Sequence, residues 1–349
     1  MRRFVLPIAL PALLAAAAAP AAHAAEPWET ANESFVCPDN QSSSPFYNGA
    51  SASATYDSTF KLGHAIPAAM LDSYVPQGLG TWKDWGGPSK DLLLQAAYND
   101  ESHRAVLVGL VPGGGETNMV TLVGPGKQGY VDAHVGGVAV AGGFLYITGD
   151  EVDGLPTVLR FALPAVAAAL ANGGELKAEA RQKVDVGRPG FKASFMSQQG
   201  RTVWIGTFDD NSRNRMYRFS IGPKGGLQRI GGPGNWQQVP KKSQGLAVTK
   251  DHFIFSTSHT SIATSNVYVI RRGKKLLDKA YPEDLTCFAA PSMSQGITLS
   301  NGKAFLSFES GSFRYRADPC DKGIFDGDCT RNVVTHLHRA SRAALIGMT

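Results

Sequence analysis

The chain has little charge and few cysteines for its length. Of its 349 residues, 18% are charged, against roughly 25% in an ordinary soluble domain, and four are cysteine. It has no heptad pattern and no glycine at every third position, which excludes a coiled coil and a collagen helix. Its 43% hydrophobic content and 17 Phe, 10 Tyr and 5 Trp exclude intrinsic disorder. The 39 Gly and 20 Pro predict many tight turns, and therefore a β-rich chain.

The first 24 residues read as a secretory signal peptide rather than as part of the fold. Arg2 and Arg3 precede an Ala- and Leu-rich apolar stretch, and Ala22-His23-Ala24 forms a small-residue cleavage motif. A membrane anchor is the alternative, but the stretch is interrupted by prolines and short for a span of ~20 residues. No later run is long and apolar enough to cross a membrane. We therefore expect an exported protein, extracellular or periplasmic, with no membrane span.

Composition divides the rest of the chain into two parts. Residues 25–57 are polar and Ser-rich and predict a tail, whereas 58–349 predict one folded domain. Without Arg2 and Arg3, the 34 basic residues fall to 32 against 29 acidic ones. A net charge of about +3 is too small to indicate nucleic acid or a membrane surface as partner. We expect a monomer whose partner is a small molecule or a glycan.

Four cysteines remain after export, where disulfides are permitted. They allow three pairings. Cys320 and Cys329 bracket a short polar loop and predict one bond, which leaves Cys37 and Cys287 as the other pair. A zinc site is the alternative, but the spacings are not those of zinc ligands.

The body of the chain repeats. Five segments begin with a strand of small residues, followed by an apolar strand with a polar end and by further strands. The starts give periods of 59, 56, 52 and 51 residues, and they lie at Gln77, Gly136, Lys192, Gln244 and Gln295. Glycine in four of the five first strands fits positions where little room exists between neighbouring strands.

Four strands in each of five repeats predict an all-β fold, a single β-propeller of five four-stranded blades. A sixth, degenerate blade stays open, whereas a β-sandwich does not explain a shared register. The last repeat lacks a fourth strand, and Ser58–Leu62 resembles the fourth strands of the others. This N-terminal strand should complete the last blade and close the ring, which removes exposed sheet edges. Residues 165–172 predict a short helix in a connecting loop.

The small-residue first strands and the blade rhythm resemble the secreted propellers of the strictosidine synthase and gluconolactonase kind. Gln-Gly-Leu at Gln77 and Gln244 is similar to the plant-type glutamine cyclotransferases. The resemblance covers roughly residues 58–339. It implies a propeller fold, a calcium-like ion in the central channel for the first families, and action on N-terminal glutamine for the last.

Two sets of polar residues should converge on one funnel, because in a propeller the first strands begin and the second strands end on the same face. A funnel with convergent polar groups is the default location for a binding site. The first set is Gln77, His134, Lys192, Gln244 and Gln295; the second is Asn99, Asp100, Asp150, Glu151, Asp209, Asp210, His259 and Glu309.

Three interpretations of these residues compete. The oxygen ligands Asn99, Glu151, Asp209 and Glu309 would hold a divalent cation, calcium above all. Alternatively, Glu151 and Asp209 would perform metal-free acid–base catalysis with His134 or His259. The third interpretation is structural, since strand ends reach solvent and Asp and Asn favour turns.

The leading hypothesis is a secreted enzyme of the hydrolase or lactonase type acting in the funnel. Its substrate would contact Gln77, Lys192, Gln244 and Gln295, together with Trp82, a loop tryptophan able to stack on a ring. The alternative is a non-catalytic carbohydrate- or protein-binding propeller. Unlike residues in the different blades favour the enzyme, because a lectin-like propeller repeats the same residues.

Overall fold

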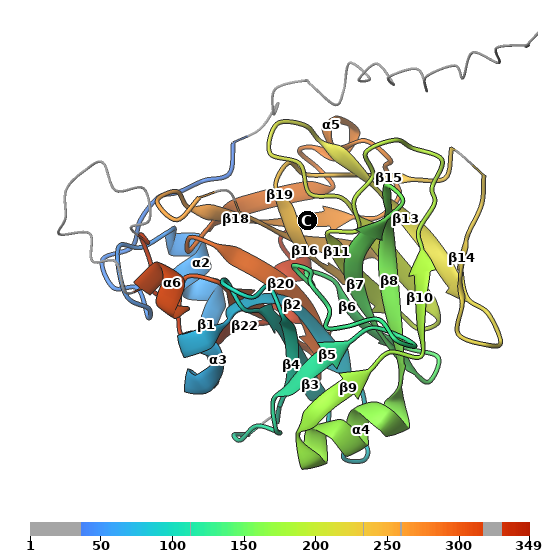
Figure 1. Ribbon diagram of the computed structural model, residues 1–349. Helices are drawn as coiled ribbons and strands as arrows, with labels where there is room; N and C mark the ends of the chain where they lie inside the picture. The colour runs from blue at the N-terminus through green and yellow to red at the C-terminus, as the bar shows by residue number, and fades with distance from the viewer. Residues whose placement is uncertain (1–35, 112, 233, 259, 317–329) are drawn as a thin grey trace, which may run out of the picture.

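Five sheets stand around a common axis (Figure 1). The computed structural model describes residues 36–111, 113–232, 234–258, 260–316 and 330–349. Each sheet contains a blade of four antiparallel strands in radial order, and two sheets carry one strand more, so the predicted five-bladed β-propeller is confirmed. The signal-peptide prediction, residues 1–24, lies outside the described residues. Within the described residues, no helix is both long and apolar enough to cross a membrane.

Each blade runs from an inner strand outward. The blades are β2(Val75–Trp82), β3(Leu92–Tyr98), β4(Ala105–Leu110), β5(Val120–Val123); β6(Val138–Ala141), β7(Phe144–Val152), β8(Leu155–Ala162), β10(Ala180–Lys183); β11(Phe195–Gln199), β12(Thr202–Gly206), β13(Asn214–Ile221), β14(Leu227–Arg229), with β15(Gln237–Val239) also on β13; β16(Ser243–Val248), β17(His252–Thr257), β18(Ser265–Arg271), β19(Leu285–Ala290); and β20(Ser294–Ser300), β21(Lys303–Phe308), β22(His336–Ser341), β1(Phe60–Ala65). The helices are short: α2(Ala54–Thr59), α3(Ala68–Ser73), α4(Leu163–Asn172), α5(Leu277–Ala280), α6(Phe313–Arg316) and α7(Arg342–Ile346).

The inner strands form a closed ring. β2 contacts β6, β6 contacts β11, β11 contacts β16, β16 contacts β20, and β20 returns to β2. The last blade takes its outer strand from the N-terminal part of the chain, where β1 pairs antiparallel with β22 and Phe60 faces Ala340. This is the predicted closure, and it covers an edge that β22 would otherwise expose.

A short helix lies in a connecting loop of the second blade, as predicted for residues 165–172. Helix α4 follows β8 and leads into β9(Gly174–Lys177), a strand that sequence analysis did not predict. Strand β9 pairs in parallel with β5 of the first blade, Thr121 facing Glu175. One connection thereby covers the outer edge of the neighbouring blade.

Glycines in the inner strands permit the blades to approach one another, as their sequence positions predicted. A Cβ on Gly136 would lie 2.2 Å from the carbonyl oxygen of Ser194 in the next blade. A Cβ on Gly296 would lie 2.3 Å from the backbone nitrogen of Leu79. Both neighbours are backbone atoms, so neither can rotate away.

We therefore expect Gly296→Ala to destabilise the ring by about 1–3 kcal/mol, the usual cost of inserting a methyl group into a packed interior. The control is Gly129→Ala, because nothing lies within 4 Å of a Cβ at that position. Urea unfolding of both variants measures the difference. Equal stability would mean that the blades do not crowd at the axis.

Buried polar side chains of the second strands donate hydrogen bonds to the inner strands at the points where the inner strands shift register. Strands β2, β16 and β20 each shift register near their start, which leaves carbonyl groups without ladder partners. The Gln95 side-chain amide donates to the carbonyl of Gly78 at 3.1 Å. The Ser307 hydroxyl donates to the carbonyl of Gly296 at 3.2 Å. Part of the polar character of these strands is therefore structural.

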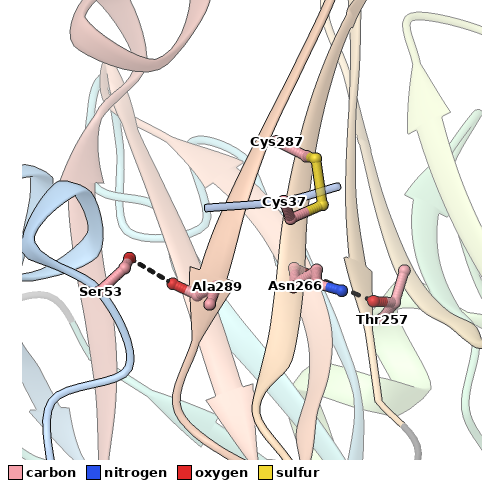
Figure 2. Close-up of a disulfide and its surroundings, with 6 residues drawn as sticks. All are labelled: Cys37, Ser53, Thr257, Asn266, Cys287 and Ala289. Atoms are coloured by element: carbon pink, nitrogen blue, oxygen red, sulfur yellow. Dashed lines mark hydrogen bonds between the residues drawn. A yellow bond between two sulfur atoms is a disulfide. The ribbon is translucent and has the colours of Figure 1, made fainter. Parts of the chain in front are cut away.

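The predicted bond between Cys37 and Cys287 is present (Figure 2), with Cα atoms 4.9 Å apart and 250 residues of sequence between the two. It fixes the N-terminal segment to β19. The Ala289 amide donates to the carbonyl of Pro38 at 2.9 Å, and the Ser53 hydroxyl donates to that of Ala289 at 2.7 Å. The expected pair Cys320–Cys329 lies outside the described residues.

Aromatic packing and a hydrogen bond, in addition to the disulfide, attach the N-terminal segment to the propeller. Phe46 and Tyr47 pack around Tyr56, a fully buried residue of α2, with ring centroids 6.2 and 5.9 Å from it. The Tyr56 hydroxyl bonds Nδ1 of buried His338 at 2.7 Å. Burial lowers the pKa of His338 to about 3, so this imidazole is neutral and structural.

Candidate functional site

A cavity of about 590 Å³ opens at the mouth where the inner strands begin. The residues that line it come from all five blades. Of the predicted funnel residues, it brings together Gln77, His134, Asp150, Glu151, Lys192, Gln244 and Glu309. The polar and aromatic lining is completed by Tyr98, Asp132, Thr148, Ser194, Phe208 and Tyr315. We call this cavity the funnel.

Glu309 is fixed by two amides. It directly follows β21, and its Oε1 accepts the side-chain amides of Gln77 at 2.5 Å and Gln295 at 2.6 Å. Burial raises the pKa of Glu309 to about 7, although hydrogen bonds from Gln77, Gln295 and Tyr315 favour its ionised form. Since Oε1 already accepts two bonds, a proton on this carboxyl belongs on Oε2. Glu309 is therefore able to donate or accept a proton near neutral pH.

His134 lies beside Tyr98 in the funnel, with ring centroids 4.6 Å apart. The two rings are tilted at 48° to each other, and His134 is an exposed residue that lines the cavity beside this buried tyrosine. Desolvation, and secondarily His103, lower the pKa of His134, so the ring is neutral at pH 7. Burial and the nearby Glu309 raise the pKa of Tyr98, which keeps it protonated.

The rim of the funnel is acidic. Asp132, Asp150 and Glu151 line one side, and Lys192 is the only Lys or Arg among the described lining residues. Asp150 pairs with Arg181 at 3.3 Å, but burial raises the pKa of Asp150 and the nearby Asp132 raises it further. Together with Glu309, these carboxyls disfavour anions and favour neutral or cationic ligands.

Several predicted residues do not line the funnel. Asn99 caps its own turn, accepting the Ser102 amide at 2.7 Å, and Asp209 accepts the Ser212 amide at 2.8 Å. Both side chains take the structural role that strand-end Asx residues often have. Gln295 acts through Glu309 rather than at the cavity wall. Trp82 lies at the opposite mouth of the ring, and His259 lies outside the described residues.

The four expected calcium ligands are thereby separated. Only Glu151 and Glu309 line the funnel, since Asn99 and Asp209 are engaged in turns. Among the described residues, no group of three or more His, Cys, Asp or Glu is placed to hold a metal ion. The four expected ligands therefore do not come together as one calcium site. Calcium binding by the protein stays a prediction.

Sequence analysis assigns no functional role to several polar or aromatic residues of the funnel. The repeat pattern does not single out Asp132 or Tyr315, and it places Tyr98, Thr148 and Phe208 only as parts of strands. A signal existed for two of them, because Asp132 lies two residues before His134 and Tyr98 ends an apolar strand. Tyr315 belongs to α6, a helix after the second strand of the last blade that the repeat pattern does not predict.

The fold and the funnel define the chain as a five-bladed β-propeller with a polar cavity at one mouth. No protein-family model matches it, and no curated protein matches it in sequence. Solved structures that match include a mutant apocarotenoid oxygenase from Synechocystis (10% identity, TM-score 0.34, 68% of this chain and 56% of that one). Others are apo AztD from Citrobacter koseri (11%, 0.27, 65% and 58%) and a neuraminidase-like protein from A/bat/Guatemala/164/2009 (10%, 0.30, 70% and 68%).

These likenesses are too distant to carry a function. The chain spans just over half the length of the oxygenase that it matches. The resemblance to strictosidine synthase, gluconolactonase and the cyclotransferases therefore stays a prediction, and function has to be argued from the funnel itself.

Proposed function

We propose that the protein is a secreted hydrolase that cleaves an ester or lactone bond of a small neutral or cationic molecule in the funnel. The observation that carries the proposal is that Glu309 and His134 line the same cavity. Burial raises the pKa of Glu309 to about 7 and lowers that of His134 below its usual value. Two groups in one cavity whose pKa values are shifted in these directions are suited to act as acid and base.

The assignment of roles follows from the protonation states. Neutral His134 accepts a proton from water as the water oxygen attacks the carbonyl carbon. As the bond between that carbon and the leaving oxygen breaks, Oε2 of protonated Glu309 gives its proton to the leaving oxygen. The products are a carboxylic acid and an alcohol, or one hydroxy acid from a lactone, and proton exchange with solvent restores both residues.

The other funnel residues bind and orient the substrate in this proposal. The Gln77 and Gln295 amides hold Glu309 in one orientation through Oε1 and do not engage Oε2. Lys192 and Gln244 supply polar contacts at the wall, and Asp132 and Glu151 repel anions at the rim. A cavity of about 590 Å³ is of the size that takes a small molecule.

A carbohydrate-binding propeller is the second candidate. Tyr98, Phe208 and Tyr315 line the same cavity, and aromatic rings with polar neighbours are suited to hold a sugar. The two candidates differ in turnover. A binding module would retain its ligand unchanged.

The test is hydrolysis of a panel of chromogenic esters, lactones and glycosides by the mature protein. We expect turnover of an ester or lactone, and a fall in kcat/KM of about 100-fold in His134→Gln, because the general base is removed. His64→Gln, which lies outside the funnel, is the matched control and should keep full activity. Binding of a panel compound without turnover would favour the carbohydrate-binding propeller, and equal loss in the two variants would exclude His134 as the base.

A further inference from the structure

A second cavity of about 460 Å³ lies at the opposite mouth of the ring. Its wall includes the far ends of the inner strands and the hairpins that follow them: Trp82 of β2, Ala141 of β6, Gln199 of β11, Val248 of β16 and Thr298 of β20. None of the described residues lines both this cavity and the funnel. We call it the lower mouth.

The charge of the lower mouth is opposite to that of the funnel. Lys83, Lys250 and Arg342 line it, and no Asp or Glu is among the described lining residues. Each of the three comes from a different blade and is exposed. None of them forms an ion pair with a described residue, so their charges remain available to a ligand.

A fourth cation supports this wall. Arg272 donates to Oε1 of Gln199 at 2.9 Å and to the carbonyls of Thr249 at 2.9 Å and Lys250 at 3.0 Å. It thereby joins the hairpins of two neighbouring blades. Asp84 and Asp251 are next to Lys83 and Lys250 in sequence but do not line the cavity, and Asp84 accepts the Ser89 amide at 2.7 Å.

The lower mouth also offers an aromatic side chain and hydroxyl groups. Trp82 is half-buried at the end of β2 and packs against the core of the first two blades. Ser197 supplies a hydroxyl on the wall, and Gln198 and Gln199 supply amides. The Thr249 and Thr298 hydroxyls also lie there but bond within the protein, to His252 and to Thr81. An indole suits the apolar face of a ring, while hydroxyls and amides suit polar substituents.

We propose that the lower mouth is a second binding site, for a small hydroxylated organic anion of the uronic acid type. Its carboxylate interacts with Lys83, Lys250 and Arg342, and its ring lies against Trp82. The site shares no residue with the funnel and goes beyond the hydrolase activity proposed above. It also gives a role to Trp82, which the funnel does not use.

The experiment is isothermal titration calorimetry of the mature protein with glucuronate, with glucose as the neutral probe and sulfate as the bare anion. We expect glucuronate to bind at one site, sulfate to compete weakly and glucose not to bind. The triple variant Lys83→Gln/Lys250→Gln/Arg342→Gln should weaken glucuronate binding about 20-fold, which is roughly 1.8 kcal/mol at about 1.4 kcal/mol per tenfold and lies within what three exposed charges can supply.

The control is the triple variant Lys61→Gln/Lys177→Gln/Lys279→Gln, which removes the same charge from exposed positions outside the cavity. It should bind glucuronate as the wild type does. Trp82→Phe tests the ring contact and should weaken glucuronate about threefold without changing sulfate. Absence of glucuronate binding, equal binding of glucose, or equal loss in the two triple variants would each overturn the proposal. Glu309→Gln should leave glucuronate binding unchanged, so the lower mouth is tested independently of the funnel.

Discussion

Replacing Glu309 by glutamine should lower kcat for the ester or lactone substrate by 100- to 10,000-fold, the range that a general acid contributes. The substitution keeps the shape of the side chain and removes its exchangeable proton. Oε1 of the new amide still accepts the bonds that Gln77 and Gln295 now donate. The loss is therefore one of chemistry rather than of position, and KM should change little.

The pH dependence of kcat/KM distinguishes Glu309 acting as the general acid from Glu309 acting as the base. Activity needs neutral His134 and protonated Glu309, so kcat/KM should rise with pH as His134 loses its proton, below the usual value of 6.5. It should fall again as Glu309 ionises about pH 7. In the pH profile of the residual activity of Glu309→Gln, the fall of kcat/KM at alkaline pH should disappear, while the rise at acid pH, which reports His134, should remain. An activity that instead rises through pH 7 would make Glu309 the base and overturn the assignment.

The same ionisation affects stability, with a definite sign. The pKa of Glu309 is about 7 in the folded protein and near 4.5 in the unfolded chain, so folding favours its protonated form. Wild-type stability should therefore fall by up to about 3 kcal/mol as pH rises from 4.5 through 7, and Glu309→Gln should lack this fall. Urea unfolding at several pH values measures it. Glu175→Gln, an exposed glutamate on β9, is the control and should behave as wild type.

The fold was predictable because one physical constraint recurs five times. Each inner strand needs small residues where neighbouring blades approach, as at Gly136 and Gly296, and each second strand is apolar because it is buried on both faces. These requirements leave a period in the sequence. The closing strand β1 was predictable from the same period, because the last repeat ends at its third strand, β22, and needs a fourth from elsewhere in the chain.

The site was predictable only in part, because polar strand ends serve two purposes. Gln77, His134 and Glu309 point to the cavity, but Asn99 and Asp209 close turns with the same kinds of atom. Sequence position does not distinguish a carboxylate that accepts a turn amide from one that lines a cavity. Trp82 shows a further limit, because it ends β2, a strand that begins at the funnel, and therefore lies at the other mouth of the ring.

The disulfide between Cys37 and Cys287 should contribute the largest single share of stability, because it joins positions 250 residues apart. Restricting so long a loop in the unfolded chain is worth about 3–5 kcal/mol in the chain-entropy account. We expect Cys37→Ala/Cys287→Ala to lower Tm by about 5–10 °C. Alanine is chosen because Cys287 is buried on β19 and a serine hydroxyl there would need a partner.

A matched variant separates the covalent bond from the contacts around it. Ser53→Ala removes the hydrogen bond from the Ser53 hydroxyl to the Ala289 carbonyl, together with the N-cap bond that this hydroxyl accepts from the Tyr56 amide, and should cost about 2 kcal/mol. Urea unfolding adds a second readout, since release of the cross-link lets the unfolded chain expose more surface and should raise the m-value in the cysteine variant alone. If the cysteine variant and Ser53→Ala lost the same stability with the same m-value, the bond would act only as one more local contact. A larger loss with a raised m-value would show that it acts on the unfolded chain, by tying the segment before β1 to the fourth blade while β1 itself completes the fifth.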